Sequence, residues 1–154
     1  MINYDEITFK IIGCAIKVHN KLGNGFQEVI YQRCLAIEFR KAGLDFDREK
    51  EQTIFYEGAE VGTRRADFII ESNVLAELKA LINLEDVHLA QAKNYLVAYD
   101  LPVGLLLNFG ARSLQFKKVY NPNYNTVNPK IVWIRILKIK GLKGWDTFLK
   151  KLCF

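Results

Sequence analysis

The chain has 154 residues, half of them hydrophobic and a quarter charged, with a formal net charge of +5. This length and balance predict one soluble globular domain with a substantial buried core. No apolar run approaches the roughly 20 residues that cross a bilayer, and the N-terminus lacks the features of a signal peptide, so a cytoplasmic location without membrane association is expected. Three cysteines without a CxxC pair and two distant histidines exclude a disulfide framework and a zinc motif.

Two helices are predicted first along the chain. Between residues 5 and 22, apolar side chains recur every three or four positions, which is typical of a helix with one buried face, and the glycine-containing segment 23–25 ends it. A second helix is predicted over residues 26–41. Glu28 and Tyr31 are three residues apart in this helix and therefore share a face.

A small sheet is predicted after the second helix. Residues 52–56 form its first strand and residues 57–58 a turn, and a second strand leads from about residue 61 into the apolar run 66–70. A polar turn separates this run from another at residues 74–79. The two runs are therefore predicted to pair as an antiparallel hairpin.

The register of this hairpin decides what its charged side chains do. If Ile70 pairs with Val74, then Asp67 lies opposite Glu77, and Lys79 lies on the same face because strand side chains alternate. Two neighbouring acids need either raised pKa values or a cation between them, and a divalent metal ion would fit. Two alternatives stay open here: the acids lie on a solvated surface, or an Arg or Lys salt bridge satisfies them without a metal.

A crossover connection follows the hairpin. Residues 84–99 have a helical pattern in which Gln91 and Tyr95 are adjacent on one face, and the apolar run 103–109 lacks alternation, which predicts a strand covered on both sides. A helix between two such strands implies a right-handed βαβ unit with parallel pairing. One more strand is predicted over residues 114–120.

Basic charge is concentrated at the C-terminal end. Residues 113–154 carry eight Lys and one Arg against one Asp, a balance of +8, which leaves −3 for residues 1–112. This charge either attracts a phosphate backbone or lies on a solvated face. The compact domain is predicted to end at residue 120, so that residues 121–154 form a basic extension that covers a sheet edge, dimerises or binds nucleic acid. Two elements are predicted within the extension, a strand at residues 131–137 and an amphipathic helix at residues 145–152.

The order of an acid on a helix, an acid on one strand and an acid-x-Lys on the next resembles the PD-(D/E)XK nuclease superfamily. More closely, residues 25–31 match the Gly-x-x-Glu-x-x-Tyr signature of the GxxExxY protein family, and a Gln-x-x-x-Tyr helix resembles the RecB-like branch. The resemblance implies an α/β, restriction-endonuclease-like core in residues 1–120, with a mixed central sheet flanked by helices. It covers roughly residues 19–120 and includes Ala66-Asp67, Glu77-Leu78-Lys79, Gln91, residues 94–96 and residues 104–110.

The resemblance also implies a metal-dependent active site. Glu28, Asp67 and Glu77 are the candidate carboxylate ligands, with the backbone carbonyl of Leu78 as an additional oxygen. Such oxygen donors suit Mg²⁺ or Mn²⁺. Lys79 completes the catalytic set by orienting the attacking water or helping to deprotonate it, and by offsetting charge on the phosphorus.

Four further residues are candidates for substrate binding or support. Gln91 and Tyr95 match the Gln-x-x-x-Tyr helix, although a pair packing on the sheet has the same spacing. Arg65 precedes Asp67 by two positions, where it meets either a phosphate or the carboxylates. Tyr31 either supports the site or is a core aromatic residue with a hydrogen-bonded hydroxyl.

Two functions are consistent with this sequence. The first is divalent-metal-dependent hydrolysis of phosphodiester bonds in nucleic acid, with DNA favoured over RNA. The second is a non-catalytic nucleic-acid-binding or protein-interaction module that retains the nuclease fold. Three acids around a lysine favour the nuclease. A homodimer, or a larger defence or repair assembly, is consistent with either function.

Overall fold

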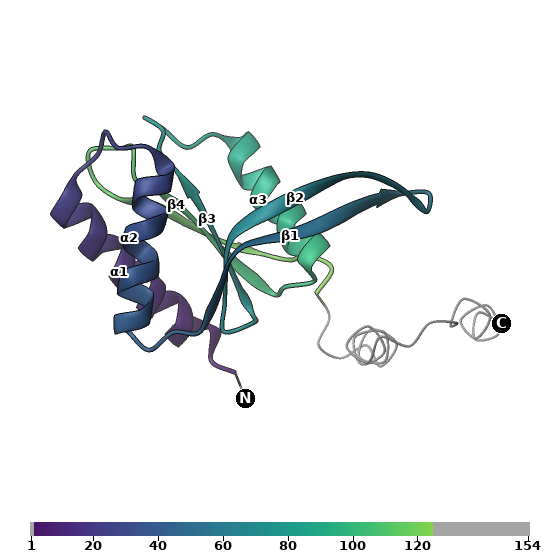
Figure 1. Cartoon of the computed structure of the whole chain (residues 1–154), viewed down its shortest axis with the longest axis horizontal. Coiled ribbons are helices and arrows are strands. Elements are labelled where there is room, and N and C mark those ends of the chain that lie inside the picture. The colour runs from purple at the N-terminus through teal and green to yellow at the C-terminus, as the bar shows by residue number, and fades with distance from the viewer. Residues whose placement is uncertain (1, 125–154) are drawn as a thin grey trace. The chain divides into compact units, whose positions relative to one another are not determined.

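Five strands form one mixed sheet in the computed structural model, which describes residues 2–124 (Figure 1). The strands lie in chain order across the sheet; β3 and β4 are parallel and every other neighbouring pair is antiparallel. The strand predicted at residues 131–137 and the helix predicted at residues 145–152 lie outside the described residues. The elements are α1 (Tyr4–Leu22), α2 (Glu28–Lys41), β1 (Phe46–Tyr56), β2 (Ala59–Ile70), β3 (Val74–Lys79), α3 (Asp86–Tyr99), β4 (Val103–Asn108) and β5 (Gln115–Tyr120).

The helices cover the two faces of the sheet separately, with α1 and α2 on one face and α3 on the other (Figure 1). The larger core includes Phe39, Phe68 and Leu105, and the smaller core, beneath α3, includes Leu75 and Leu96. Every residue of β4 is buried, because helices pack on both of its sides. The predicted α/β architecture and the parallel βαβ unit are confirmed. No helix among the described residues is long and apolar enough to cross a membrane.

The element boundaries differ most from the predicted ones at β1. This strand begins at Phe46, six residues earlier than predicted, because residues 47–51 are all charged and exposed and so show no apolar alternation. The second helix begins at Glu28 and α3 begins two residues later than predicted. In α3 the start is defined by reciprocal capping bonds between Glu85 and His88, which gives this histidine a structural role.

The hairpin of β2 and β3 has the predicted register. Ile70 pairs with Val74, and Phe68 pairs with Ala76. Two of the turn residues between the strands adopt positive φ angles of 50° and 55°. Backbone pairing between these strands extends no further than Phe68 and Ala76 within the described ladder. The charged residues of interest lie directly beyond this point.

The side chain of Asn108 joins the ends of β3 and β4. It is fully buried, and its Oδ1 accepts hydrogen bonds from the backbone N–H groups of Leu81 at 2.9 Å and Gly110 at 3.2 Å, while its Nδ2 donates to the carbonyl of Leu81 at 2.9 Å. The N–H of Phe109 also donates to the carbonyl of Lys79 at 2.8 Å. These bonds fix the backbone that follows the acid-x-Lys sequence.

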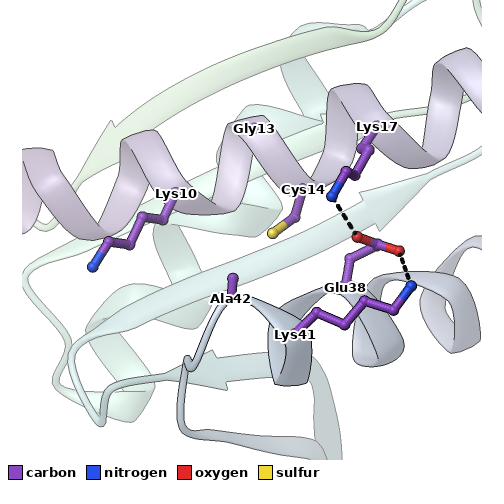
Figure 2. A pocket seen from close by; sticks show the side chains of 7 residues that line it. All are labelled: Lys10, Gly13, Cys14, Lys17, Glu38, Lys41 and Ala42. Atoms are coloured by element: carbon purple, nitrogen blue, oxygen red, sulfur yellow. Dashed lines mark hydrogen bonds and ion pairs between the residues drawn. The ribbon is translucent and has the colours of Figure 1, made fainter.

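On the surface between the first two helices, Glu38 of α2 lies between the ammonium groups of Lys17 and Lys41, at 3.2 and 3.0 Å (Figure 2). Hydrogen bonds from Lys41 and Lys17 lower the pKa of Glu38. These side chains border a hollow of about 340 Å³, whose third lysine, Lys10, pairs with Glu6. Each of the three lysines already pairs with an acid, so the described residues of the hollow offer no unpaired positive charge to a ligand. We interpret it as part of the packing between α1 and α2.

We expect Gly110→Ala to destabilise the protein by on the order of 3 kcal/mol or more. A methyl group at this position would overlap with backbone atoms of Ala80 and Leu81, which cannot move without breaking the Asn108 bonds. Urea unfolding of both proteins measures the difference. The matched control is Gly13→Ala, at an exposed position of α1, where an added methyl group meets no neighbouring atom within 4 Å. This variant should gain about 0.5–1 kcal/mol of stability. Equal stability of the two variants would contradict the close approach at Gly110.

Candidate active site

Asp67 lies directly beyond the part of β2 that pairs with β3, and two hydrogen bonds from different elements hold its side chain. The backbone N–H of Leu78 on β3 donates to its Oδ2 at 2.8 Å, and the side-chain Nε2 of Gln32 on α2 donates to its Oδ1 at 3.0 Å. The side chain is half-buried. Both carboxylate oxygens are therefore oriented by the fold.

Glu77 lies beside Asp67 and is almost completely buried, at 5% exposure. Its Oε1 accepts a hydrogen bond from the backbone N–H of Asp67 at 3.3 Å. Beyond the paired part of the hairpin, each acid thus accepts a backbone N–H from the opposite strand. These side-chain bonds take the place of the next backbone–backbone hydrogen bonds between β2 and β3, and they bring the two carboxylates together at this end of the hairpin.

All three candidate acids have raised pKa values. Burial, followed by the charge of Asp67, raises the pKa of Glu77 to about 8. Burial also raises the pKa of Asp67, against the opposing hydrogen bonds from Leu78 and Gln32, and burial together with Asp67 raises the pKa of Glu28. The positive charge of Lys79 opposes each of these increases.

The salt-bridge alternative is not found in the described part of the chain. Among residues 2–124, no Lys or Arg forms an ion pair with Asp67 or Glu77. Lys79 acts on the acids through its field rather than through a direct contact. The fully solvated alternative fails as well, because Glu77 is buried. The acid pair is therefore enclosed without a neutralising partner, which is costly in the absence of a cation.

A cavity of about 310 Å³ opens between α2 and the β1–β2 strands. Glu28, Arg65 and Asp67 line it together, so the predicted sharing of a face by Arg65 and Asp67 is confirmed. Glu28 is the first residue of α2, and the cavity therefore lies at the helix N-terminus. The remaining lining residues are Val29, Gln32 and Glu49.

Sequence reasoning missed two of these lining residues, Gln32 and Glu49. Gln32 lies four positions after Glu28, a spacing that puts both on one helix face and could have identified it. Glu49 is in a left-handed conformation, with φ of +54°, and its charge contributes to the raised pKa of Asp67. No pattern in the sequence marks it, because it stands in a run of charged residues.

Tyr31 is a core residue, as the second of its two interpretations predicted. It is 0% exposed and stacks on Phe109, with ring centroids 4.6 Å apart. Its hydroxyl donates to the carbonyl of Gly23 at 2.8 Å and accepts from the N–H of Phe26 at 3.2 Å. Tyr31 thereby fixes the loop that leads into Glu28.

Gln91 and Tyr95 lie together on α3, where Gln91 Nε2 and the Tyr95 hydroxyl are 3.5 Å apart. The Arg64 guanidinium lies over the Tyr95 ring at 5.4 Å, so this part of α3 packs against β2. Neither α3 residue lines the cavity that contains Glu28. Gln91 and Tyr95 therefore contact each other, but a role for them at the cavity stays a prediction.

The donor set fits a hard divalent ion, because Asp67 and Glu77 supply carboxylate oxygens and neither forms an ion pair within residues 2–124. Mg²⁺ is commonly bound through one or two carboxylates, with waters and substrate phosphates completing the shell. Within residues 2–124, no three acidic, His or Cys side chains are gathered closely enough to hold an ion between them. The fit is therefore to the pair Asp67 and Glu77, and Glu28 stays a prediction as a third ligand.

Comparison with known proteins gives one family and one fold. The family model described as the PD-(D/E)XK nuclease superfamily matches residues 5–119. The fold is similar to that of a solved structure described as "Crystal structure of SSO0001", with 17% sequence identity and a TM-score of 0.52. The similarity covers 77% of this chain and 59% of that one, so this chain spans little more than half of that protein. No curated protein matches the sequence.

We expect the metal-free protein to lose stability as the pH rises from 5 to 9. The pKa of Glu77 is about 8 in the folded protein and near 4.5 in the unfolded chain, so the folded state binds more protons in this window. The stabilisation is complete below the lower value and is lost as the pH rises through the higher one. The loss should be on the order of 3 kcal/mol, measured by urea unfolding in a chelator.

The matched variant for this prediction is Glu77→Gln, which keeps the side-chain oxygen but cannot ionise. Its stability should fall by much less over the same window, because only the raised pKa values of Asp67 and Glu28 then contribute, and should exceed that of the unchanged protein at pH 9. Glu60→Gln, at an exposed position on β2, is the control and should retain the full pH dependence. The same slope in Glu77→Gln as in the unchanged protein would show that Glu77 is not the group responsible.

Proposed function

The chain belongs to the PD-(D/E)XK nuclease superfamily, and we propose that it hydrolyses phosphodiester bonds in nucleic acid with a divalent metal ion. The observation that carries this proposal is the adjacent pair of Asp67, which is half-buried, and Glu77, which is buried. Neither acid forms an ion pair among the described residues, and Lys79 lies two positions after Glu77 on β3. A domain without catalysis gains no stability from enclosing such a pair.

In this proposal, Asp67 and Glu77 hold Mg²⁺ or Mn²⁺, with Glu28 at the helix N-terminus as a further acid. A bound divalent ion supplies positive charge that stabilises the developing charge on phosphate and lowers the pKa of water. Lys79 hydrogen-bonds to the attacking water and offsets charge on the phosphoryl oxygens. Arg65, exposed at the rim of the cavity, binds a substrate phosphate.

We further propose that the chain belongs to the GxxExxY family, in the RecB-like branch, and that its substrate is DNA. The contacts of the signature residues support the family assignment. Gly25 has φ of +102°, which favours glycine, Glu28 begins α2, and the Tyr31 hydroxyl holds the connecting loop. Each residue of the signature thus contributes to where the acid of α2 is placed.

We expect Lys79→Ala to lower the cleavage rate by at least about 100-fold, because the ammonium group acts on water and phosphate at the reacting centre. Single-turnover cleavage of single-stranded and duplex DNA and RNA in Mn²⁺ measures the effect. Glu77→Ala should abolish cleavage while leaving the protein folded. The control is Lys10→Ala, which removes an exposed lysine of α1.

Unchanged cleavage by Lys79→Ala or Glu77→Ala would contradict this mechanism. Binding of nucleic acid by the unchanged protein, without cleavage of any of these substrates in Mn²⁺, would instead support the non-catalytic module. Loss of cleavage in Lys10→Ala as well would indicate an effect of surface charge rather than of the site.

The basic extension generates a separate prediction. Residues 125–154 carry six Lys and one Arg against one Asp. Truncation after Tyr124 should weaken nucleic-acid binding and reduce its dependence on salt, because fewer counterions are released. The cut belongs there rather than after Tyr120, because the buried side chain of Asn121 donates to the carbonyls of Leu96 and Leu101. An equal salt slope for the two proteins would show that the extension is only solvated.

A further inference from the structure

Gln32 is a buried polar residue that contacts a candidate metal ligand directly. Only 6% of it is exposed, and its Nε2 donates to the Oδ1 of Asp67 at 3.0 Å. Buried amides are normally hydrogen-bonded, so a contact of this kind needs no function by itself. What distinguishes Gln32 is its partner and its place on the wall of the cavity, beside Glu28 and Arg65.

The two oxygens of the Asp67 carboxylate accept hydrogen bonds from different elements. Leu78 of β3 holds Oδ2 and Gln32 of α2 holds Oδ1. Each carboxylate oxygen can accept about two hydrogen bonds or ligand contacts, so each retains capacity for a metal ion. The backbone bond from Leu78 cannot be lost without disturbing the sheet. The second bond, which fixes the plane of the carboxylate, depends on the Gln32 side chain alone among the described residues.

Helix α2 is well suited to hold that side chain rigidly. Leu35 and Phe39 are fully buried in the larger core and anchor the helix on the sheet. The Tyr31 hydroxyl fixes its entry loop. Since Glu28 and Gln32 are four residues apart, they lie on one face of the helix. The helix that carries one acid of the cavity thus also orients another.

We propose that Gln32 is a positioning residue that holds the Asp67 carboxylate in the orientation needed to bind a divalent metal ion. This inference rests on the proposed function. The amide must act as a donor. A side chain of similar size without an N–H group fills the same space but leaves the carboxylate held by the Leu78 bond alone, so that its plane can turn about the Cβ–Cγ bond. Partners of metal ligands typically contribute about 10- to 100-fold to metal affinity.

The test uses the full chain with Mn²⁺ alone and requires no substrate. Gln32→Met keeps the unbranched shape and volume of the side chain, and Gln32→Leu is a second apolar replacement. The control is Gln52→Met. Gln52 of β1 is partly buried, and its Nε2 donates to the carbonyl of Ala98 in α3, the helix on the opposite face of the sheet. Calorimetry gives the Mn²⁺ dissociation constant, and thermal unfolding in a chelator gives the stability of each protein.

Both Gln32 variants should bind Mn²⁺ about 10- to 100-fold more weakly than the unchanged protein. Gln52→Met also removes an amide that donates to a backbone carbonyl, but it should keep its Mn²⁺ affinity, because Gln52 does not contact either acid. In cleavage assays, the Mn²⁺ concentration for half-maximal rate should rise for the Gln32 variants only.

Three results would count against the inference in different ways. Strong Mn²⁺ binding by the unchanged protein and equal binding by folded Gln32→Met would overturn the positioning role and leave the proposed function standing. Absence of Mn²⁺ binding and of cleavage in the unchanged protein would overturn the proposed function, and the inference with it. Equal weakening in the Gln32 and Gln52 variants would assign the effect to stability and overturn the inference as well.

Discussion

Two carboxylates enclosed side by side at the end of a β-hairpin are the constraint on which this structure depends. Asp67 and Glu77 each accept a backbone N–H from the opposite strand, so the acids take the place of ladder bonds and cannot turn away from each other freely. Burial raises both pKa values. The charge of Lys79 opposes the increases, but no Lys or Arg among the described residues forms an ion pair with either acid. A cation bound by the two carboxylates would offset the remaining cost of burying them.

The surrounding elements hold the acid pair on rigid parts of the fold. β3 is buried except at its last residue, and the Asn108 side chain fixes the backbone beyond Lys79. On the other side, α2 contributes Glu28 and the Gln32 amide from a helix anchored in the core. Sites built on strands and helices keep their geometry better than sites on loops. Of the residues that line the cavity, Glu49 has a left-handed backbone, a conformation that is strained for a residue other than glycine.

Much of this arrangement could be predicted from local sequence patterns. The polar turn between Ile70 and Val74 was sufficient for the hairpin register. The helix between two strands, together with the uninterrupted apolar run of β4, was sufficient for the parallel crossover. The spacing from Glu28 could have placed Gln32 on the face of the acid. Its contact with Asp67, and the place of Glu49 in the cavity, depend on how α2 and β1 pack against β2, which no local pattern contains. The charged start of β1 was missed for a related reason, since an exposed strand needs no apolar face.

The central claim is that the enclosed acid pair is a site for a divalent cation, and anomalous diffraction from crystals grown with Mn²⁺ tests it most directly. The account predicts an anomalous peak in contact with the carboxylates of both Asp67 and Glu77. A structure at saturating Mn²⁺ with no peak there, and with both carboxylates still bound only to the backbone and to Gln32, would contradict it.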